Sequence, residues 1–297
     1  MCMGLGCHAV GITGCRIIDS RRERLIAMLT CAFVPCNGRL PTLIALCTLF
    51  FAVGGGIWGA IGSSVLLALM IIVSIIATLA CSKILSKTLL RGEPSAFTLE
   101  LPPYRIPKVR QVLVRSVLDR TLHVLKRAVC VAAPAGAILW LLANWSVEGL
   151  SLLSYMASYL DPLARFLCLD GAILLGFLLA IPANEIVLPV ILMTYTASSG
   201  LVEYGSLADL GAMFSQNGWT AATAVATCLL MLFHFPCATA LWTLKKESGR
   251  LRYVLLAAIL PTVLGIVLCF LSFCVKFYFF NLSQSLARSW HLCYNLS

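Results

Sequence analysis

The sequence predicts an all-α, polytopic integral membrane protein with about five to seven membrane segments, two of which are broken or re-entrant. Hydrophobic residues make up 60% of the 297 residues, and charged residues make up only 11%. The mean hydropathy is +0.95. This much apolar surface is typical of a chain that lies in lipid rather than of a soluble domain. We therefore expect a multi-pass protein in a lipid bilayer.

Six apolar runs follow one another along the chain, at about residues 25–55, 63–82, 128–143, 171–197, 219–243 and 253–275. Prolines interrupt the first run at Pro35 and Pro41 and the fourth at Pro182 and Pro189. A proline has no N–H and clashes with the preceding turn, so it kinks or ends a helix. These breaks divide the chain into a first gate-like membrane region (1–82), a cytoplasmic linker (83–127), a second gate-like membrane region (128–277) and a C-terminal tail (278–297).

The linker 83–127 ends in a basic, helically spaced stretch. Apolar residues recur at helical spacing from Val109 to Leu125, and Arg110, Arg115 and Arg120 lie largely off that face. Such a pattern predicts an amphipathic helix in the membrane interface. The alternative is a helix packed on a soluble partner.

The charges predict the topology of the chain. The net charge is +10, and the basic residues fall in short segments between apolar runs. This is the orienting pattern of membrane proteins, so we expect no nucleic-acid partner. Segments 16–24, 83–127 and 244–252 are rich in Lys and Arg and are predicted to be cytoplasmic, whereas acids dominate 144–170 and 198–218, which are predicted to be external. With two external flanks, 171–197 must enter the membrane and return.

Glu185 lies at the predicted turn of this re-entrant segment, within Pro182-Ala-Asn-Glu185. A carboxylate at membrane depth costs a few kcal/mol, so it usually faces a cavity, a partner or an ion. A broken helix, freed carbonyls and one acid together indicate an ion or substrate site of a transporter. The alternative is a kinked helix whose glutamate pairs with a basic residue elsewhere.

A second pair of short segments supports a site between two repeats. Val34-Pro-Cys-Asn-Gly-Arg-Leu40 resembles Phe235-Pro-Cys-Ala-Thr-Ala-Leu241, and each follows an earlier glycine- or proline-broken element. Paired discontinuous segments in corresponding halves of a transporter indicate a binding site at the repeat interface. Pro236 would leave the carbonyl of Leu232 without its helical donor, because proline has no N–H.

Potential metal ligands gather beside these prolines: Cys7, His8, Cys31, Cys36, Asn184, Glu185, His234 and Cys237. Thiolate, imidazole and carboxylate groups suit a borderline ion such as Fe²⁺ better than Mg²⁺ or Ca²⁺, which prefer oxygen alone. His234 and Cys237 are three residues apart, which predicts one face of a helix. Taken singly, a buried Cys or His in a membrane helix is more often part of the packing than a ligand; the concentration of these residues beside prolines is what favours a site. No motif for nucleophilic catalysis or phosphate binding occurs, so we expect a non-enzymatic chain with no permanently bound cofactor.

Six ordered motifs resemble the membrane portion of the ferrous iron transport protein B family of prokaryotes. They are Gly4-Leu-Gly-Cys7, Ile18-Asp-Ser-Arg-Arg-Glu-Arg-Leu25, Phe33-Val-Pro-Cys36 with Arg39-Leu-Pro41, Glu100-Leu-Pro-Pro-Tyr-Arg105, Pro182-Ala-Asn-Glu185, and Phe235-Pro-Cys-Ala-Thr239 with Lys246-Glu247. The resemblance implies a multi-pass protein of the prokaryotic inner membrane that conducts Fe²⁺. It also implies that Cys7, Cys36, Glu185 and Cys237 line the iron path, with Asn184 beside them; we add His234 to this ligand set.

The departures from the family concern what is missing. Family members begin with a GTPase domain and further membrane helices, which this chain lacks. The resemblance therefore implies a separately encoded GTPase and N-terminal half as a partner, together with a small cytoplasmic accessory protein; a homo-oligomer is possible. Two alternatives stay open: a gate-type protein for another solute such as nucleosides, and an inactive, truncated remnant.

Overall fold

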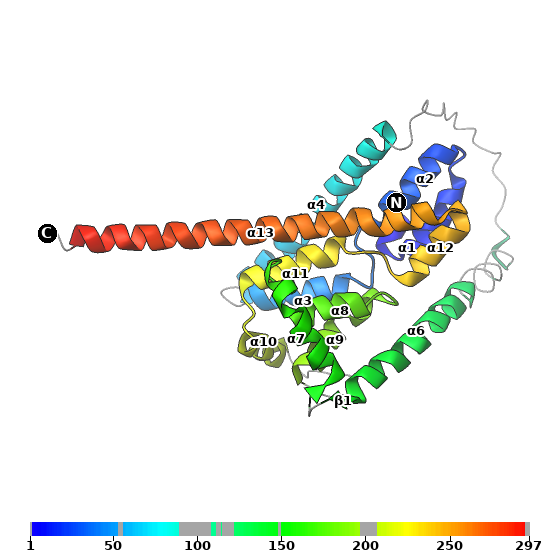
Figure 1. Cartoon of the computed structure of the whole chain (residues 1–297). Coiled ribbons are helices and arrows are strands. Elements are labelled where there is room, and N and C mark those ends of the chain that lie inside the picture. The colour runs from blue at the N-terminus through cyan, green and yellow to red at the C-terminus, as the bar shows by residue number, and fades with distance from the viewer. Residues whose placement is uncertain are drawn as a thin grey trace.

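A computed structural model describes residues 2–52, 56–88, 108–110, 114, 122–147, 150–196 and 207–294 of the chain. Within these residues the protein is helical apart from one two-stranded hairpin (Figure 1). Of the predicted interfacial helix, residues 109, 110 and 114 are helical, and the rest of 111–121 lies outside the described residues.

The described part of the first half of the chain contains four α-helices and three short 3-10 helices. They are η1 (Cys2–Leu5), α1 (His8–Gly14), η2 (Cys15–Ile17), α2 (Arg21–Thr30), η3 (Cys31–Phe33), α3 (Leu40–Phe51) and α4 (Gly56–Lys87). The side chain of Ser20 caps α2 by accepting a hydrogen bond from the backbone N–H of Glu23. The helix therefore begins at the basic segment, as N-capping by serine predicts.

Among the described residues, the second half contains eight α-helices, a 3-10 helix and the hairpin. They are α6 (Leu122–Asn144), β1 (Ser146–Val147), β2 (Leu150–Ser151), α7 (Leu152–Arg165), α8 (Gly171–Leu179), η5 (Asn184–Ile186), α9 (Val187–Thr196), α10 (Leu207–Gln216), α11 (Ala221–Phe233), α12 (Ala238–Ser248) and α13 (Leu251–Tyr294). Strands β1 and β2 are antiparallel, with Ser146 opposite Ser151. No helix end marks the predicted boundary of the tail at residue 277, because α13 continues to Tyr294.

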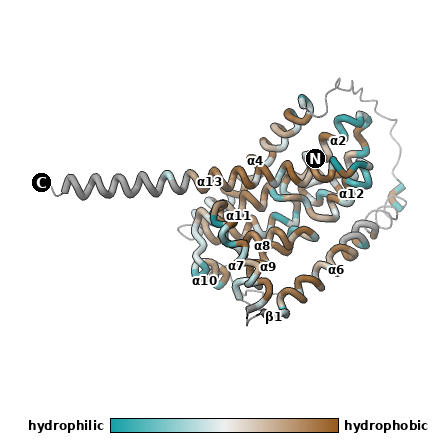
Figure 2. Tube along the Cα trace, in the orientation of Figure 1, coloured by the Kyte–Doolittle hydropathy of each residue, from teal (hydrophilic) through white to brown (hydrophobic). Residues whose placement is uncertain are grey.

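Three helical stretches are long and apolar enough to cross a membrane: Ile57–Lys87, Ala221–Ser248 and Leu251–Cys274. Figure 2 shows the apolar residues spread along α4 and the first part of α13, whereas hydrophilic residues concentrate in α2 and at the end of α12. A membrane surrounds such helices with lipid, so their exposed apolar faces need no protein partner. The protein is an all-α membrane protein, as predicted.

The two halves share one core. Phe33 of η3 and Phe233 of α11 pack edge to face, with ring centroids 6.2 Å apart. Arg16 of η2 forms a bidentate ion pair with Glu247 of α12. Its Nε and Nη2 donate to the two carboxylate oxygens at 2.8 and 2.5 Å. The first half therefore contacts the second both in its buried centre and at its polar surface.

Two of the four prolines predicted to break helices instead begin them. Pro41 is the second residue of α3 and Pro189 is the third residue of α9. The first N–H groups of a helix have no partner within it, so proline is tolerated there at no cost in hydrogen bonds. Pro35 and Pro182 do lie in non-helical backbone.

Candidate ion site at two helix breaks

The first break lies between η3 and α3, at residues 34–39. The backbone N–H of Asn37 donates to the carbonyl of Gly6, just before α1, at 3.2 Å. Behind it, the Cys31 thiol lies so close to Gly4 and Gly11 that a Cβ added at either would be 2.9 or 2.8 Å from the sulfur. Glycine is therefore needed at both positions for the start of the chain to pack on this break.

The second break lies between α11 and α12, at residues 234–237, and it makes the same contact. The N–H of Ala238 donates to the carbonyl of Ile181, at 2.7 Å. The donors correspond, because Ala238 directly follows Cys237 and Asn37 directly follows Cys36. The acceptors correspond as well: Ile181 lies in the element broken by Pro182, and Gly6 lies in the glycine-broken element at the start of the chain. The two paired segments of the sequence thus form equivalent hydrogen bonds in the structure.

Helices α8 and α9 pack together as a hairpin. A Cβ added at Gly176 of α8 would lie 2.9 Å from Ile191 Cγ1 and 3.1 Å from the Val187 carbonyl, both of α9. At the open end, Tyr195 of α9 donates its hydroxyl to Asp170, the N-cap of α8. The helices contain nine and ten residues and so extend about 14 and 15 Å, half of a hydrocarbon core of about 30 Å. Neither helix is long enough to span a membrane alone, and the re-entrant placement of the hairpin stays a prediction.

Arg39 joins the two breaks. Its side chain is fully buried, and Nη1 donates to the carbonyls of Ala32 and Leu232 at 3.2 and 2.9 Å. Nη2 donates to the carbonyls of His234 and Phe235 at 2.9 and 3.2 Å. The Leu232 carbonyl, predicted to lose its helical donor to Pro236, thus has a guanidinium as its partner. Each hydrogen bond from a charged donor contributes roughly 1.5–3 kcal/mol.

Three of the six predicted ligands form a buried row between the breaks. Nδ2 of Asn184 lies 3.8 Å from Sγ of Cys36, and Oδ1 of Asn184 lies 3.1 Å from Nε2 of His234. Asn184 comes from η5 at the turn of the hairpin. The turn therefore delivers one amide between a thiol of the first break and an imidazole of the second.

His234 and Cys237 do not share a helical face, so that prediction is wrong. His234 is the C-cap of α11 and Cys237 is the N-cap of α12. Pro236 lies between them and the backbone around it is extended, which separates positions that would be neighbours in a continuous helix.

The remaining three predicted ligands lie less deep. Cys7 is the N-cap of α1, and both Cys7 and Cys237 are half-buried. Glu185 is exposed on the surface of the chain, and its side chain lies against Gly38 of the first break. Among the described residues, no three His, Cys, Asp or Glu side chains are close enough to hold a metal ion together. The six residues thus form no closed cage in the described part of the chain.

His8, which the sequence places among the potential ligands, is also buried between the breaks. Its Nε2 lies 2.7 Å from the carbonyl of Val34. A carbonyl only accepts, so Nε2 carries the proton and Nδ1 of the neutral ring is an acceptor. That Nδ1 is buried and has no hydrogen-bond partner in the described part of the chain.

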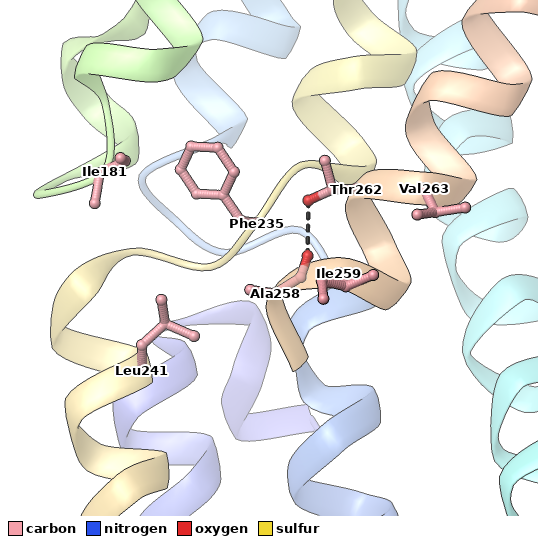
Figure 3. A pocket seen from close by; sticks show the side chains of 7 residues that line it. All are labelled: Ile181, Phe235, Leu241, Ala258, Ile259, Thr262 and Val263. Atoms are coloured by element: carbon pink, nitrogen blue, oxygen red, sulfur yellow. Dashed lines mark hydrogen bonds between the residues drawn. The ribbon is translucent and has the colours of Figure 1, made fainter. Parts of the chain in front are cut away.

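An apolar pocket of about 380 Å³ lies next to the second break. Figure 3 shows Phe235 between Ile181 of the hairpin turn and the α13 residues around Thr262, whose hydroxyl donates within α13 to Ala258. The lining is formed by Ile181, Phe235, Leu241, Ala258, Ile259, Thr262 and Val263. Apart from the hydroxyl of Thr262 the lining side chains are apolar, so this pocket offers few ligands to an ion.

A helical membrane protein with two equivalent helix breaks that meet in its interior has the architecture of a transporter or channel. Family models agree with this class. One described as "Ferrous iron transport protein B C terminus" matches residues 67–119, and one described as "Nucleoside recognition" matches residues 125–251.

Curated relatives identify the resemblance more closely. The chain is 26% identical over 283 residues to "Fe(2+) transporter FeoB" of Staphylococcus aureus strain MSSA476, covering 91% of this chain and 39% of the relative. It is 27% identical over 264 residues to the "Fe(2+) transporter FeoB" of Synechocystis sp., covering 88% of this chain and 40% of the relative. A "Fe(2+) transport protein A/Fe(2+) transporter FeoB fusion protein" of Porphyromonas gingivalis is 23% identical over 327 residues, covering 94% and 37%. The chain resembles the C-terminal membrane portion of FeoB, as its motifs predicted.

The chain spans about two fifths of the length of these relatives. No solved structure matches the chain.

Proposed function

We propose that the chain is a membrane transport subunit that conducts Fe²⁺ between its two helix breaks. The observation that carries the proposal is the buried row of Cys36, Asn184 and His234, which joins the two breaks of a chain that resembles FeoB over most of its length. Thiol, imidazole and amide groups in one row suit a borderline divalent ion.

The path in this proposal runs past Cys7, Cys36, Glu185 and Cys237, with Asn184 and His234 as neighbouring ligands. A transported ion must be bound well enough to enter and weakly enough to leave. Ligands spread along a route meet this requirement better than a closed cage of three or four, because the ion exchanges a few ligands at each step.

The proposal includes partners and a place in the cell. The relatives are more than twice as long as this chain, so we propose that a separately encoded GTPase and N-terminal half, and a small accessory protein, complete the transporter. The name of the Porphyromonas gingivalis relative joins "Fe(2+) transport protein A" to a FeoB, which supports an accessory protein of that kind. We place the assembly in the inner membrane of a prokaryote, with GTP hydrolysis outside this chain.

The decisive experiment is uptake of radioactive Fe²⁺ under reducing conditions in an iron-transport-deficient bacterium. The chain is expressed alone, with its neighbouring reading frames, and with those frames in a Glu185→Gln or Cys237→Ser variant. We expect uptake with the complete set and at least a tenfold loss in either variant. Unchanged uptake in both variants would show that the path runs elsewhere.

A second candidate substrate follows from the model described as "Nucleoside recognition", which matches residues 125–251. If the chain conducts a nucleoside, adenosine or uridine will raise the melting temperature of the purified protein and Fe²⁺ will not. The opposite result favours iron.

A further inference from the structure

Arg39 is a buried cation without a buried anion beside it. Its side chain is 0% exposed, and in the described part of the chain no carboxylate pairs with it. Burying a guanidinium is costly unless its charge and its donors are compensated. The compensation for Arg39 therefore comes from the four carbonyls to which Nη1 and Nη2 donate, while its buried Nε has no hydrogen-bond partner among the described residues.

These carbonyls belong to the ends of two helices. Leu232 is in the last turn of α11, and His234 and Phe235 follow the end of that helix. Ala32 lies in η3, directly after α2. The C-terminal end of a helix carries a partial negative charge and unpaired carbonyl oxygens. Two such ends thus converge on one positively charged side chain.

Unwound carbonyls and the C-terminal ends of broken helices are the groups that bind monovalent cations in membrane transporters. In this protein the four carbonyls lie 2.9–3.2 Å from the terminal nitrogens of Arg39. We propose that they form a monovalent-cation site that the chain fills with its own guanidinium, so that no free Na⁺ binds between the breaks.

This site links the two repeats. Arg39 follows the first break, whereas three of its four acceptors lie at the second, 193 to 196 residues away. A tethered cation cannot dissociate, so the two negative helix ends stay compensated at any Na⁺ concentration. As a consequence that rests on the proposed function, Fe²⁺ uptake needs no Na⁺ at this position.

The test is the thermal stability of the purified full chain in detergent, because stability does not depend on whether the chain transports iron. Arg39→Ala removes the tethered cation and leaves the carbonyls. Guanidinium chloride at low-millimolar concentration restores a planar cation. Urea at the same concentration restores the shape without the charge. NaCl controls for ionic strength and offers a smaller cation. Arg39→Lys and Arg39→Met keep a long side chain with and without a charge.

We expect guanidinium to raise the melting temperature of Arg39→Ala by several degrees, urea not to raise it, and the wild type to respond to neither. Rescue by urea equal to that by guanidinium, or no rescue by any cation in a folded Arg39→Ala variant, would overturn the proposal. If Arg39→Ala does not fold, the two long variants decide. A higher melting temperature of Arg39→Lys supports a cation site, and equal stability of Arg39→Lys and Arg39→Met refutes it. Failure of the iron-uptake assay leaves each of these readouts intact.

Discussion

Gly38 positions the Glu185 side chain, and the substitution Gly38→Ala tests the iron path with a single methyl group. An added Cβ would lie 2.9 Å from Glu185 Cγ and 3.2 Å from Oε1. Carbon atoms in contact prefer about 3.5–4.0 Å, so the Glu185 side chain must move by about 1 Å. Because Glu185 is exposed, the move costs little stability, on the order of 0.5 kcal/mol.

Transport should respond more strongly than stability. Displacement of a functional group by about 1 Å can reduce a rate by up to about 10²-fold, and we expect at least a tenfold loss of Fe²⁺ uptake in the complete system. The assay pairs initial uptake rates with melting temperatures. Gly136→Ala in α6 is the matched control, since nothing lies within 4 Å of a Cβ built there.

The double variant Gly38→Ala with Glu185→Gln decides the cause. If the methyl group acts through Glu185, the double variant transports no worse than Glu185→Gln alone, because contacting residues are not additive. Wild-type uptake by Gly38→Ala, or full additivity of the two losses, would refute a role for the position of Glu185 in the path.

Three further predictions concern the packing around the site. Gly176→Val should lower the stability of the chain by about 2 kcal/mol, measured by thermal unfolding, since a side chain there overpacks the hairpin; an unchanged melting temperature would contradict the close packing of α8 on α9. Asn184→Ala should lower the free energy of unfolding by about 1–3 kcal/mol, because it leaves the buried imidazole of His234 without its partner. It should also speed alkylation of Cys36, whose sulfur lies beside Asn184; equal labelling rates in the variant and the wild type would argue against the buried row. Arg16→Ala should lower the free energy of unfolding by less than about 1 kcal/mol, and by less still at high salt, since Arg16 is exposed. A larger or salt-independent loss of stability would point to a buried role.

The breaks were predictable because proline has a local effect. Pro182 and Pro236 lack an N–H wherever they lie, so the ends of α8 and α11 follow from the sequence. The same rule failed at Pro41 and Pro189, because a proline that ends one helix cannot be told from a proline that begins the next without knowing where that helix starts. The wrong pairing of His234 with Cys237 has the same origin, since it assumed a continuous helix across Pro236.

The role of Arg39 was not predictable from local pattern. Three of its four partners lie about two hundred residues away, and of these carbonyls only that of Leu232 is marked in the sequence, by Pro236. One signal was present: Arg39 is a basic residue inside an apolar run, next to two prolines. A charge at such a position has to find partners at membrane depth, although the sequence does not say which.

The half-length hairpin also has an electrical consequence. In the proposed re-entrant placement its turn lies about midway through the bilayer, so an ion on the proposed path from the Asp170 end of the hairpin to Asn184 would cross about half of the membrane potential. For a divalent ion this equals one elementary charge across the whole field, about 2.3 kcal/mol per 100 mV. With the opposite side negative, that energy raises occupancy of the turn about 50-fold. The resting voltage of a cell would thus load the site before any nucleotide is hydrolysed.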